Sequence, residues 1–358
     1  MKHVLVLFSF LLFADFIFAQ TDADLFNRAD SLHKIMFSID THIDTPICTN
    51  HPDDDYGVDK GQVTFPLMKK GGLDAALFAI YIEQGGRTDD SLRMATEYVV
   101  NEINLFKEHV KKNKKEAGIA YKADDFWKLK KKGKSIVMFS IENGYAFGKD
   151  ISNVEMFYKL GVRAIVMCHN YDNDVCDASR YQTNEWGGLS PFGYEVVREM
   201  NRLGMIVDIS HGSTATLYDC LEASKSPIIA SHSACYAIKN HPRNLTDQEM
   251  RDIAAKGGLV QVSTGTFFIS NLPDKVVTIK HIADHIEYAA SIIGMDHVGI
   301  GTDFDGGGGN IGFENASKAR DLTVELMRRG FSDDEIQNFW GRNFLRVLRE
   351  VERVSREK

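Results

Sequence analysis

The sequence has few of the residues that build disulfide scaffolds or flexible linkers. Its 358 residues include 5 cysteines and 7 prolines, with no Cys-x-x-Cys pair and no low-complexity segment. An odd number of widely spaced cysteines does not form a disulfide framework or a thiolate zinc site. We expect Cys168 and Cys235, which lie near the motifs described below, to be buried and unreactive. Because no linker divides the chain after its first segment, we predict a single domain over residues 20–358.

An excess of positive charge is also missing. The chain has 42 Lys and Arg against 50 Asp and Glu, a formal net charge of -8. A nucleic-acid partner would require clustered basic residues that exceed the acidic ones. The two short basic runs, 111–115 and 128–134, belong to helix-like polar stretches. We therefore expect no nucleic-acid partner.

Long apolar runs are absent except near the N-terminus. There, Lys2 precedes the run "VLVLFSFLLFA", which Asp15 ends. Ile17 and Ala19 occupy the -3 and -1 positions of a signal-peptidase site, and the run is too short for a comfortable membrane span. We interpret residues 1–19 as a cleaved signal peptide, with a retained anchor as the alternative. The expectation is an exported protein, periplasmic or secreted, with no membrane anchor after signal removal.

Short apolar runs alternate with amphipathic segments along the rest of the chain. The strand-like runs are 37–43, 73–82, 135–142, 162–169, 204–211, 227–232, 257–263 and 297–304, and the helix-like segments are 90–112, 190–203, 213–224, 246–256, 278–293, 316–329 and 332–350. Eight buried strands that alternate with helices predict an α/β fold, a (β/α)8 TIM barrel. A doubly wound open sheet is the alternative, but it favours a Gly-rich phosphate turn after an early strand. The Gly-rich stretch here, 305–310, follows the last strand instead.

Ionisable side chains occur at the carboxyl ends of six predicted strands. His42 and Asp44 lie two residues apart at the end of the first, so both side chains point to the same face. The other strand ends carry Glu142, His169, Asp208, His211, His232 and Asp303. Singly, each could be a hydrogen-bonded structural histidine or a helix-capping aspartate. Together they predict a shared metal-centred site, because the active sites of such barrels lie at this end.

Nitrogen and oxygen ligands of this kind suit Zn²⁺, Mn²⁺ or Fe²⁺. The number of ligands exceeds what one catalytic zinc uses, and this favours two metals roughly 3.5–4 Å apart with one bridging carboxylate. Such a pair lowers the pKa of a bridging water and yields hydroxide near neutral pH. From residue type alone, His169 could also be a ligand and Arg243 could be a surface residue. Asp208 could orient a ligand from outside the coordination sphere.

Five stretches together resemble the membrane dipeptidase (renal dipeptidase) family, peptidase family M19, whose members are amidohydrolase-like metallo-barrels. They are "DTHIDTP", "GLSPFGYEVVREMNRLGMIVDISH", "PIIASHSACYAI", "HPRNL" and "GIGTDFDG". The resemblance covers essentially the whole chain after the signal segment. It implies a zinc-dependent dipeptidase that acts on small dipeptide substrates, and a possible homodimer. The family tolerates a C-terminal D-residue, and whether this chain does is open.

The resemblance also implies a role for individual residues. His42 and Asp44 would hold the first Zn²⁺, Glu142 would bridge two Zn²⁺ ions per chain, and His211 and His232 would hold the second.

Three further residues would act on the substrate. Asp303 would carry a proton from the attacking water to the leaving amine, and His169 would stabilise the tetrahedral oxyanion. Arg243 would pair with the free carboxylate of the dipeptide.

Some positions depart from the family pattern. Asn143, Gly144 and Tyr145 replace a Gly-Gly-His-like continuation, "VSTGTFF" lacks a tyrosine used beside the substrate carboxylate, and Ile47 stands where an aromatic residue is common. We expect these positions to line the substrate pocket and to alter side-chain preference. A lactonase or deacylase on the same dinuclear site is therefore an alternative activity, and a catalytically silent barrel is a second alternative. The presence of Asp303 argues against a silent protein.

Overall fold

The computed structural model describes residues 21–45, 61–181 and 183–357. The predicted signal peptide, Ile47 and Cys48 therefore lie outside the described residues. In the part that is described, no helix has the length and apolar character needed to cross a membrane.

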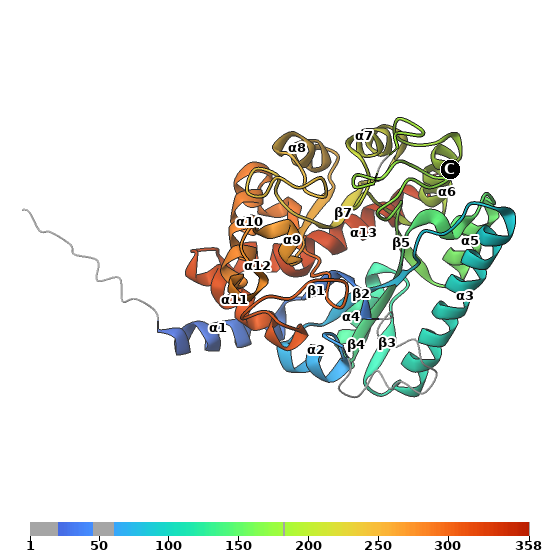
Figure 1. Cartoon of the computed structure of the whole chain (residues 1–358). Helices are drawn as coiled ribbons and strands as arrows, with labels where there is room; N and C mark the ends of the chain where they lie inside the picture. The colour runs from blue at the N-terminus through green and yellow to red at the C-terminus, as the bar shows by residue number, and fades with distance from the viewer. Residues whose placement is uncertain (1–20, 46–60, 182, 358) are drawn as a thin grey trace, which may run out of the picture.

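Nine parallel strands form one sheet within the described residues, and eight of them follow one another in chain order around a barrel (Figure 1). The strands are β1 (Ile39–Ile43), β2 (Ala75–Tyr81), β3 (Ala117–Ile119), β4 (Ser135–Glu142), β5 (Val162–Val166), β6 (Ile206–Asp208), β7 (Ile229–Ser233), β8 (Leu259–Val262) and β9 (Val298–Ile300). β3 lies outside this order and pairs with β4. The barrel closes beyond β9, where Asp303 N donates to His42 O at 3.0 Å and Asp44 N donates to Phe304 O at 2.8 Å. The predicted (β/α)8 fold is confirmed.

Helices alternate with the strands and surround them (Figure 1). They are α1 (Asp22–Ile35), α2 (Phe65–Gly71), α3 (Asp89–Lys112), α4 (Ala123–Lys130), α5 (Ser152–Lys159), α6 (Pro191–Leu203), α7 (Thr214–Ala223), α8 (Asp247–Ala255), α9 (Thr266–Ile269), α10 (Ile279–Ile293), α11 (Ala319–Arg328), α12 (Asp333–Gln337) and α13 (Asn343–Val354). Local sequence sets several boundaries. Ser190 caps the first turn of α6, and Gly204 ends that helix in the left-handed conformation at φ 84°.

The C-terminal helical segment differs from its prediction. The stretch 332–350 was expected to be one helix, but a π-helical turn, Asn338–Arg342, separates α12 from α13. Close packing accompanies this turn, because a Cβ at Gly341 would come within 2.8 Å of Phe37 O. The elements α1, α2, β3, α4 and α5 were not predicted. Apart from α1, these elements span at most eight residues, which is short for a periodic pattern to be recognised.

The amino-terminal end of the barrel is filled by apolar side chains. Helix α13 runs behind the strands in Figure 1, and its Phe344, Leu348 and Val351 belong to one buried cluster with Ile39 of β1 and Leu77 of β2. The polar side chains that the sequence predicts for the site lie at the carboxyl ends of the strands, at the opposite end of the barrel.

Candidate metal centre and active site

Glu142, the last residue of β4, lies at the centre of a cluster of histidines. Its Oε1 is 3.1 Å from His211 Nε2, 3.5 Å from His232 Nε2 and 4.0 Å from His169 Nε2. Its Oε2 is 3.5 Å from His42 Nε2. His169 is partly exposed, whereas the other four residues are buried. One carboxylate thus faces imidazoles from four different strand ends, as the barrel prediction requires.

The same cluster contains buried polar atoms that lack hydrogen-bond partners. These atoms include both ring nitrogens of His42, Oδ1 of Asp44 and Nδ1 of His211. His211 Nε2 and His232 Nε2 approach each other to 3.0 Å. Buried polar atoms are normally satisfied, so a converging set of unpaired nitrogen and oxygen atoms calls for a ligand.

Three overlapping triads satisfy the spacing of a metal site, with the ligand atoms of each within 4.8 Å of one another. The triads are His42, Asp44 and Glu142; Glu142, His169 and His211; and His42, His232 and Asp303. Nitrogen and oxygen donors without thiolate fit a divalent zinc, manganese or iron ion. The residues present therefore fit the predicted metal centre.

The carboxyl groups of the cluster influence one another strongly. Burial works to raise the pKa of Glu142, but His42, His211 and His232 hold it well below its usual range. Burial and the charge of Glu142 raise the pKa of Asp44 well above its usual range, and burial raises that of Asp303. Simultaneous ionisation of three carboxyl groups this close is unfavourable, because the carboxylates repel one another. A bound cation would relieve that repulsion.

Unusual backbone conformations direct these side chains into the barrel mouth. His211 has φ 70° and Asp303 has φ 63°, and Asn143, directly after Glu142, has φ 94°. Positive φ is uncommon for residues other than glycine and costs free energy that the surrounding structure must offset. Such conformations cluster at functional sites. Their position at three strand ends supports a shared chemical role for this end of the barrel.

Two buried aspartates beneath the cluster join neighbouring strands. Asp208 Oδ1 accepts hydrogen bonds from Ser210 N and Ser231 N, both at 3.0 Å. It therefore positions the segments that carry His211 and His232 through the backbone, whereas the sequence suggested direct orientation of a ligand. The ring of His232 is fixed by a different group, since its Nδ1 lies 2.9 Å from Ser231 Oγ.

Asp40 performs the equivalent function between β1 and the end of β9. Its carboxylate accepts from His42 N, Thr302 N and Thr302 Oγ1. Sequence reasoning missed Asp40. The available signal was its spacing, because Asp40, His42 and Asp44 alternate along one strand and share a face.

Arg243 is buried beside the cluster without a carboxylate partner among the described residues. Its Nη2 donates to His232 O at 3.3 Å, its Nε has no hydrogen-bond partner, and its Cζ lies 5.3 Å from the ring of Phe268. Burial lowers the pKa of Arg243 to about 10. A buried guanidinium with unused donors can accept an anionic ligand.

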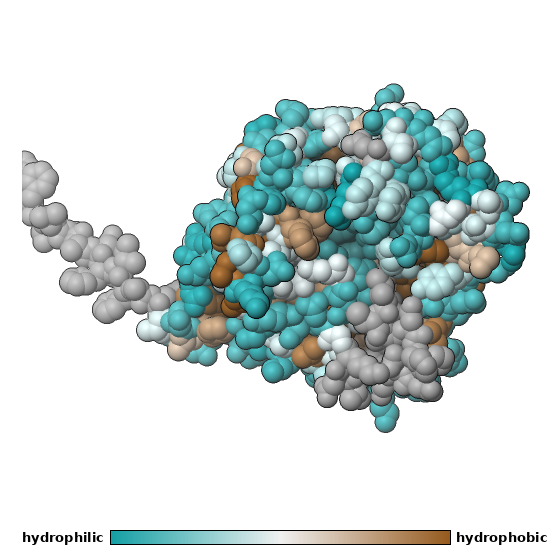
Figure 2. Space-filling view, viewed as in Figure 1, coloured by the Kyte–Doolittle hydropathy of each residue, from teal (hydrophilic) through white to brown (hydrophobic). Residues whose placement is uncertain are grey.

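A pocket of about 430 Å³ opens over the cluster. It is lined by Asp44, Tyr81, Glu142, His169, Asn170, Arg180, His211, Gly265, Phe267, Phe268, Asp303, Asp305, Gly306 and Gly307. This volume lies within the range of small-molecule sites. Hydrophilic residues cover most of the face of the molecule seen in Figure 2.

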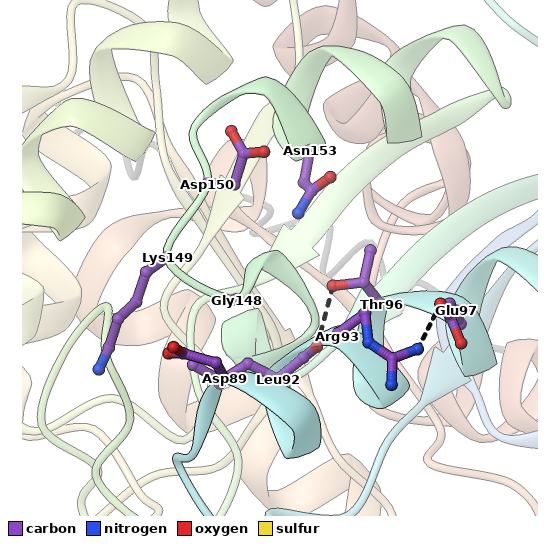
Figure 3. A pocket seen from close by; sticks show the side chains of 9 residues that line it. All are labelled: Asp89, Leu92, Arg93, Thr96, Glu97, Gly148, Lys149, Asp150 and Asn153. Atoms are coloured by element: carbon purple, nitrogen blue, oxygen red, sulfur yellow. Dashed lines mark hydrogen bonds and ion pairs between the residues drawn. The ribbon is translucent and has the colours of Figure 1, made fainter.

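A second cavity, of about 450 Å³, lies between α3 and the segment that leads into α5 (Figure 3). It is lined by surface residues such as Arg93, which pairs with Glu97 at 2.8 Å. None of the predicted strand-end side chains lines it. Of the two cavities, only the one over Glu142 combines a pocket with metal-ligating groups.

The positions that depart from the family pattern divide into two groups. Residues 143–145 were expected to line the pocket, and this is wrong, because none of the three is among the residues that line it. Tyr145 Oη instead donates to Gly86 O at 2.5 Å. The "VSTGTFF" segment does reach the pocket, through Gly265, Phe267 and Phe268.

None of the four cysteines in the described part of the chain belongs to the metal triads. Cys168 and Cys235 are buried as expected, and so are Cys176 and Cys220.

Comparison with known proteins agrees with this geometry. Residues 26–358 match the family model described as "Membrane dipeptidase (Peptidase family M19)". The chain belongs to the membrane dipeptidase family. It is thus a metallo-dipeptidase by family, and the resemblance noted in its sequence is confirmed.

Individual relatives extend the comparison. Dipeptidase tcpJ of Claviceps purpurea (strain 20.1) is 32% identical over 300 residues, which are 82% of this chain and 70% of the relative. Dipeptidase aclJ of Aspergillus oryzae (strain ATCC 42149 / RIB 40) is 34% identical over 306 residues, 83% of this chain and 71% of the relative. The crystal structure of the probable dipeptidase PvdM from Pseudomonas aeruginosa has a TM-score of 0.88 and 29% identity, and the match covers 93% of this chain and 99% of that one.

Proposed function

We propose that this dipeptidase holds two Zn²⁺ ions and uses them to hydrolyse dipeptides to free amino acids. The observation that carries the proposal is the position of Glu142, whose carboxylate oxygens lie within 4.0 Å of four imidazole nitrogens. His42 and Asp44 would hold one ion, His211 and His232 the other, and Glu142 both. Bound zinc supplies a water of lowered pKa and polarises the peptide carbonyl.

Asp303 is the proposed proton carrier. Its carboxylate is buried, lines the pocket, and belongs to the same triad as His42 and His232. Burial raises its pKa, which brings the carboxyl group closer to the range useful for general acid–base catalysis. Asp303 accepts the proton of the attacking water as the C–O bond forms. It then gives that proton to the amine nitrogen as the C–N bond breaks.

His169 is the proposed donor to the developing oxyanion. Burial lowers its pKa, so the imidazole is neutral at pH 7 and carries one N–H. It lines the pocket beside Tyr81, whose ring meets it edge-on at 4.8 Å. A hydrogen bond from this N–H to the carbonyl oxygen strengthens as negative charge develops.

Arg243 is the proposed site for the free carboxylate of the substrate. Its unused donors and its lack of an ion pair among the described residues support this role. Substrates without that carboxylate, such as lactones or acylated amines, would leave the buried guanidinium unpaired. We therefore favour dipeptide hydrolysis over lactonase or deacylase activity.

The test combines metal analysis with a substrate panel. Purified enzyme is expected to contain about two zinc ions per chain and to cleave L,L, L,D and glycyl dipeptides, as the resemblance implies. Asp303→Asn is expected to retain the metal and lose turnover. Metal-free protein, or cleavage of lactones and acyl amines but of no dipeptide, would overturn the proposal. Export, proposed from residues 1–19 alone, is checked by N-terminal sequencing of secreted or periplasmic material.

A further inference from the structure

Arg180 is the cationic residue that lines the pocket mouth. It is exposed, and no ion pair or hydrogen bond joins its side chain to any described residue. The acidic groups of the same pocket are engaged elsewhere. Asp305 accepts from Thr45 Oγ1 at 2.6 Å and from Gln62 N at 2.8 Å, and the other carboxylates belong to the metal cluster. The Arg180 charge is therefore available to a ligand.

The backbone on both sides of Arg180 is fixed to the active site. Ser179 N donates to the carbonyl oxygen of His211 at 2.7 Å. Tyr181 N donates at 2.9 Å to Asn170 O, next to His169. The proposed metal ligand His211 and Asn170, the residue after His169, thus hold the backbone on the two sides of Arg180 through single hydrogen bonds.

The side chain of Arg180 also has a defined support. Its Cζ lies 5.0 Å from the Tyr181 ring, which stacks on Tyr171 with centroids 4.9 Å apart. An arginine held against an aromatic face keeps its guanidinium edge free for hydrogen bonds. Arg180 therefore presents its donors at a fixed place beside the pocket.

The dipeptide itself does not need a second arginine. Its α-carboxylate is assigned to the buried Arg243, and its amino group can approach Asp305, the lining carboxylate that is neither a proposed metal ligand nor the proposed proton carrier. Arg180 is the arginine or lysine that lines this pocket, so a side-chain carboxylate at the mouth would find its cationic partner there. A planar guanidinium also matches a carboxylate with two parallel hydrogen bonds.

We propose that Arg180 makes the enzyme selective for dipeptides that carry an aspartate or glutamate side chain. The inference rests on the proposed dipeptidase function and names its substrate class. Arg180 is a specificity-determining residue in this account, and it takes no part in bond breaking.

The experiment compares isosteric substrates. Values of kcat/KM are measured for Ala-Glu against Ala-Gln and for Glu-Ala against Gln-Ala. The unaltered enzyme is expected to prefer the acidic member of at least one pair by about fivefold or more, the effect of a partly exposed but bidentate ion pair. Arg180→Ala should abolish the preference, and Arg180→Lys should keep part of it. Arg180→Glu should reverse the charge preference, so that this variant cleaves Ala-Lys with a higher kcat/KM than Ala-Gln.

A matched control separates local binding from net charge. Arg353 lies on α13 at the opposite end of the barrel and is paired with Glu350 and Glu357. Arg353→Ala makes the same charge change and should leave the acidic preference intact. Equal kcat/KM within both pairs, or a preference that survives Arg180→Ala, would overturn the inference while leaving dipeptide hydrolysis established. Failure of the unaltered zinc enzyme to cleave any dipeptide would overturn both.

Discussion

The hydroxyl of Thr302 donates a 2.6 Å hydrogen bond to Oδ2 of Asp40, beneath the metal cluster. Asp40 Oδ1 also accepts from Thr302 N at 2.9 Å and from His42 N at 3.2 Å. This carboxylate therefore sets the separation between the segment that carries His42 and the one that carries Asp303.

Replacing Asp40 with asparagine should weaken the metal centre. The amide keeps the shape but turns one acceptor into a donor, which faces the donors of Thr302. Loss of such supporting contacts typically lowers metal affinity by about 10–100-fold. Competition with a chelator measures the affinity, and circular dichroism verifies the fold. Thr302→Ser keeps the hydroxyl and should bind metal normally. Unchanged affinity in Asp40→Asn would contradict this role.

Gly306→Ala should displace two carboxylates of the site. A Cβ at Gly306 would lie 1.9 Å from Asp44 Oδ2 and 2.6 Å from Asp303 Oδ1, closer than atoms can approach. We expect kcat to fall by about tenfold or more, since small misplacements of catalytic groups are costly. The control is Gly307→Ala, whose Cβ would meet nothing within 4 Å. That change strains a positive φ of 132° and should reduce stability more than it reduces turnover. Equal kcat in the two variants would refute the steric argument.

Arg243→Ala should raise KM for dipeptides while changing kcat less. The variant removes the proposed partner of the substrate carboxylate, and such an interaction would be made in both the ground state and the transition state. Loss of a charge-assisted pair predicts an increase in KM of about tenfold or more. Steady-state kinetics on Ala-Ala and on its C-terminal amide supplies the measurement. The amide lacks the charge, so its KM should respond less to the substitution. An unchanged KM for Ala-Ala would remove Arg243 from substrate binding.

Mild acid should destabilise the fold through His33 of α1. Its Nδ1 lies 2.9 Å from Gly72 O and its Nε2 2.8 Å from Thr323 Oγ1, which also accepts from Trp340 Nε1. Burial lowers the pKa of His33 to about 4. In the unfolded chain the imidazole has its ordinary pKa near 6.5. Between pH 6.5 and pH 4, His33 is therefore protonated in the unfolded chain and neutral in the folded protein.

The stability lost through His33 between pH 7 and pH 5 is about 2 kcal/mol. Urea unfolding at the two pH values should show a smaller difference in His33→Gln than in the unaltered protein, because glutamine keeps a donor and an acceptor but does not titrate. An identical pH dependence in both would exclude His33 as a contributor.

Much of the fold follows from local pattern. The alternation of apolar runs and amphipathic segments predicted the barrel, and the two-residue spacing of His42 and Asp44 predicted that both enter one mouth. The three-residue β3 carries too short a pattern to be detected, and the helix break at 338–342 depends on Gly341 meeting Phe37. Contacts between distant segments are not visible in a linear sequence.

The candidate site likewise contains residues that the sequence predicts and residues that it does not. Residue type and position at strand ends are enough to predict that the histidines and carboxylates lie close together. Asp40 and Gly306 escaped notice because their roles depend on Thr302 and Asp44, which only the closed barrel brings near. Arg180 was not predicted for a related reason. Its proposed role depends on a guanidinium that is unpaired among the described residues, and a sequence does not show which side chains are unpaired.

The apolar base formed by α13 has a kinetic consequence. With Phe344, Leu348 and Val351 packed into that end of the barrel, the described residues leave the mouth over Glu142 as the route to the site. In the proposed reaction a dipeptide would enter, and both amino acids would depart, through this opening. With Arg243 in its proposed role, the product that retains the α-carboxylate would compete with the next substrate for this residue, and accumulated amino acids would slow the enzyme.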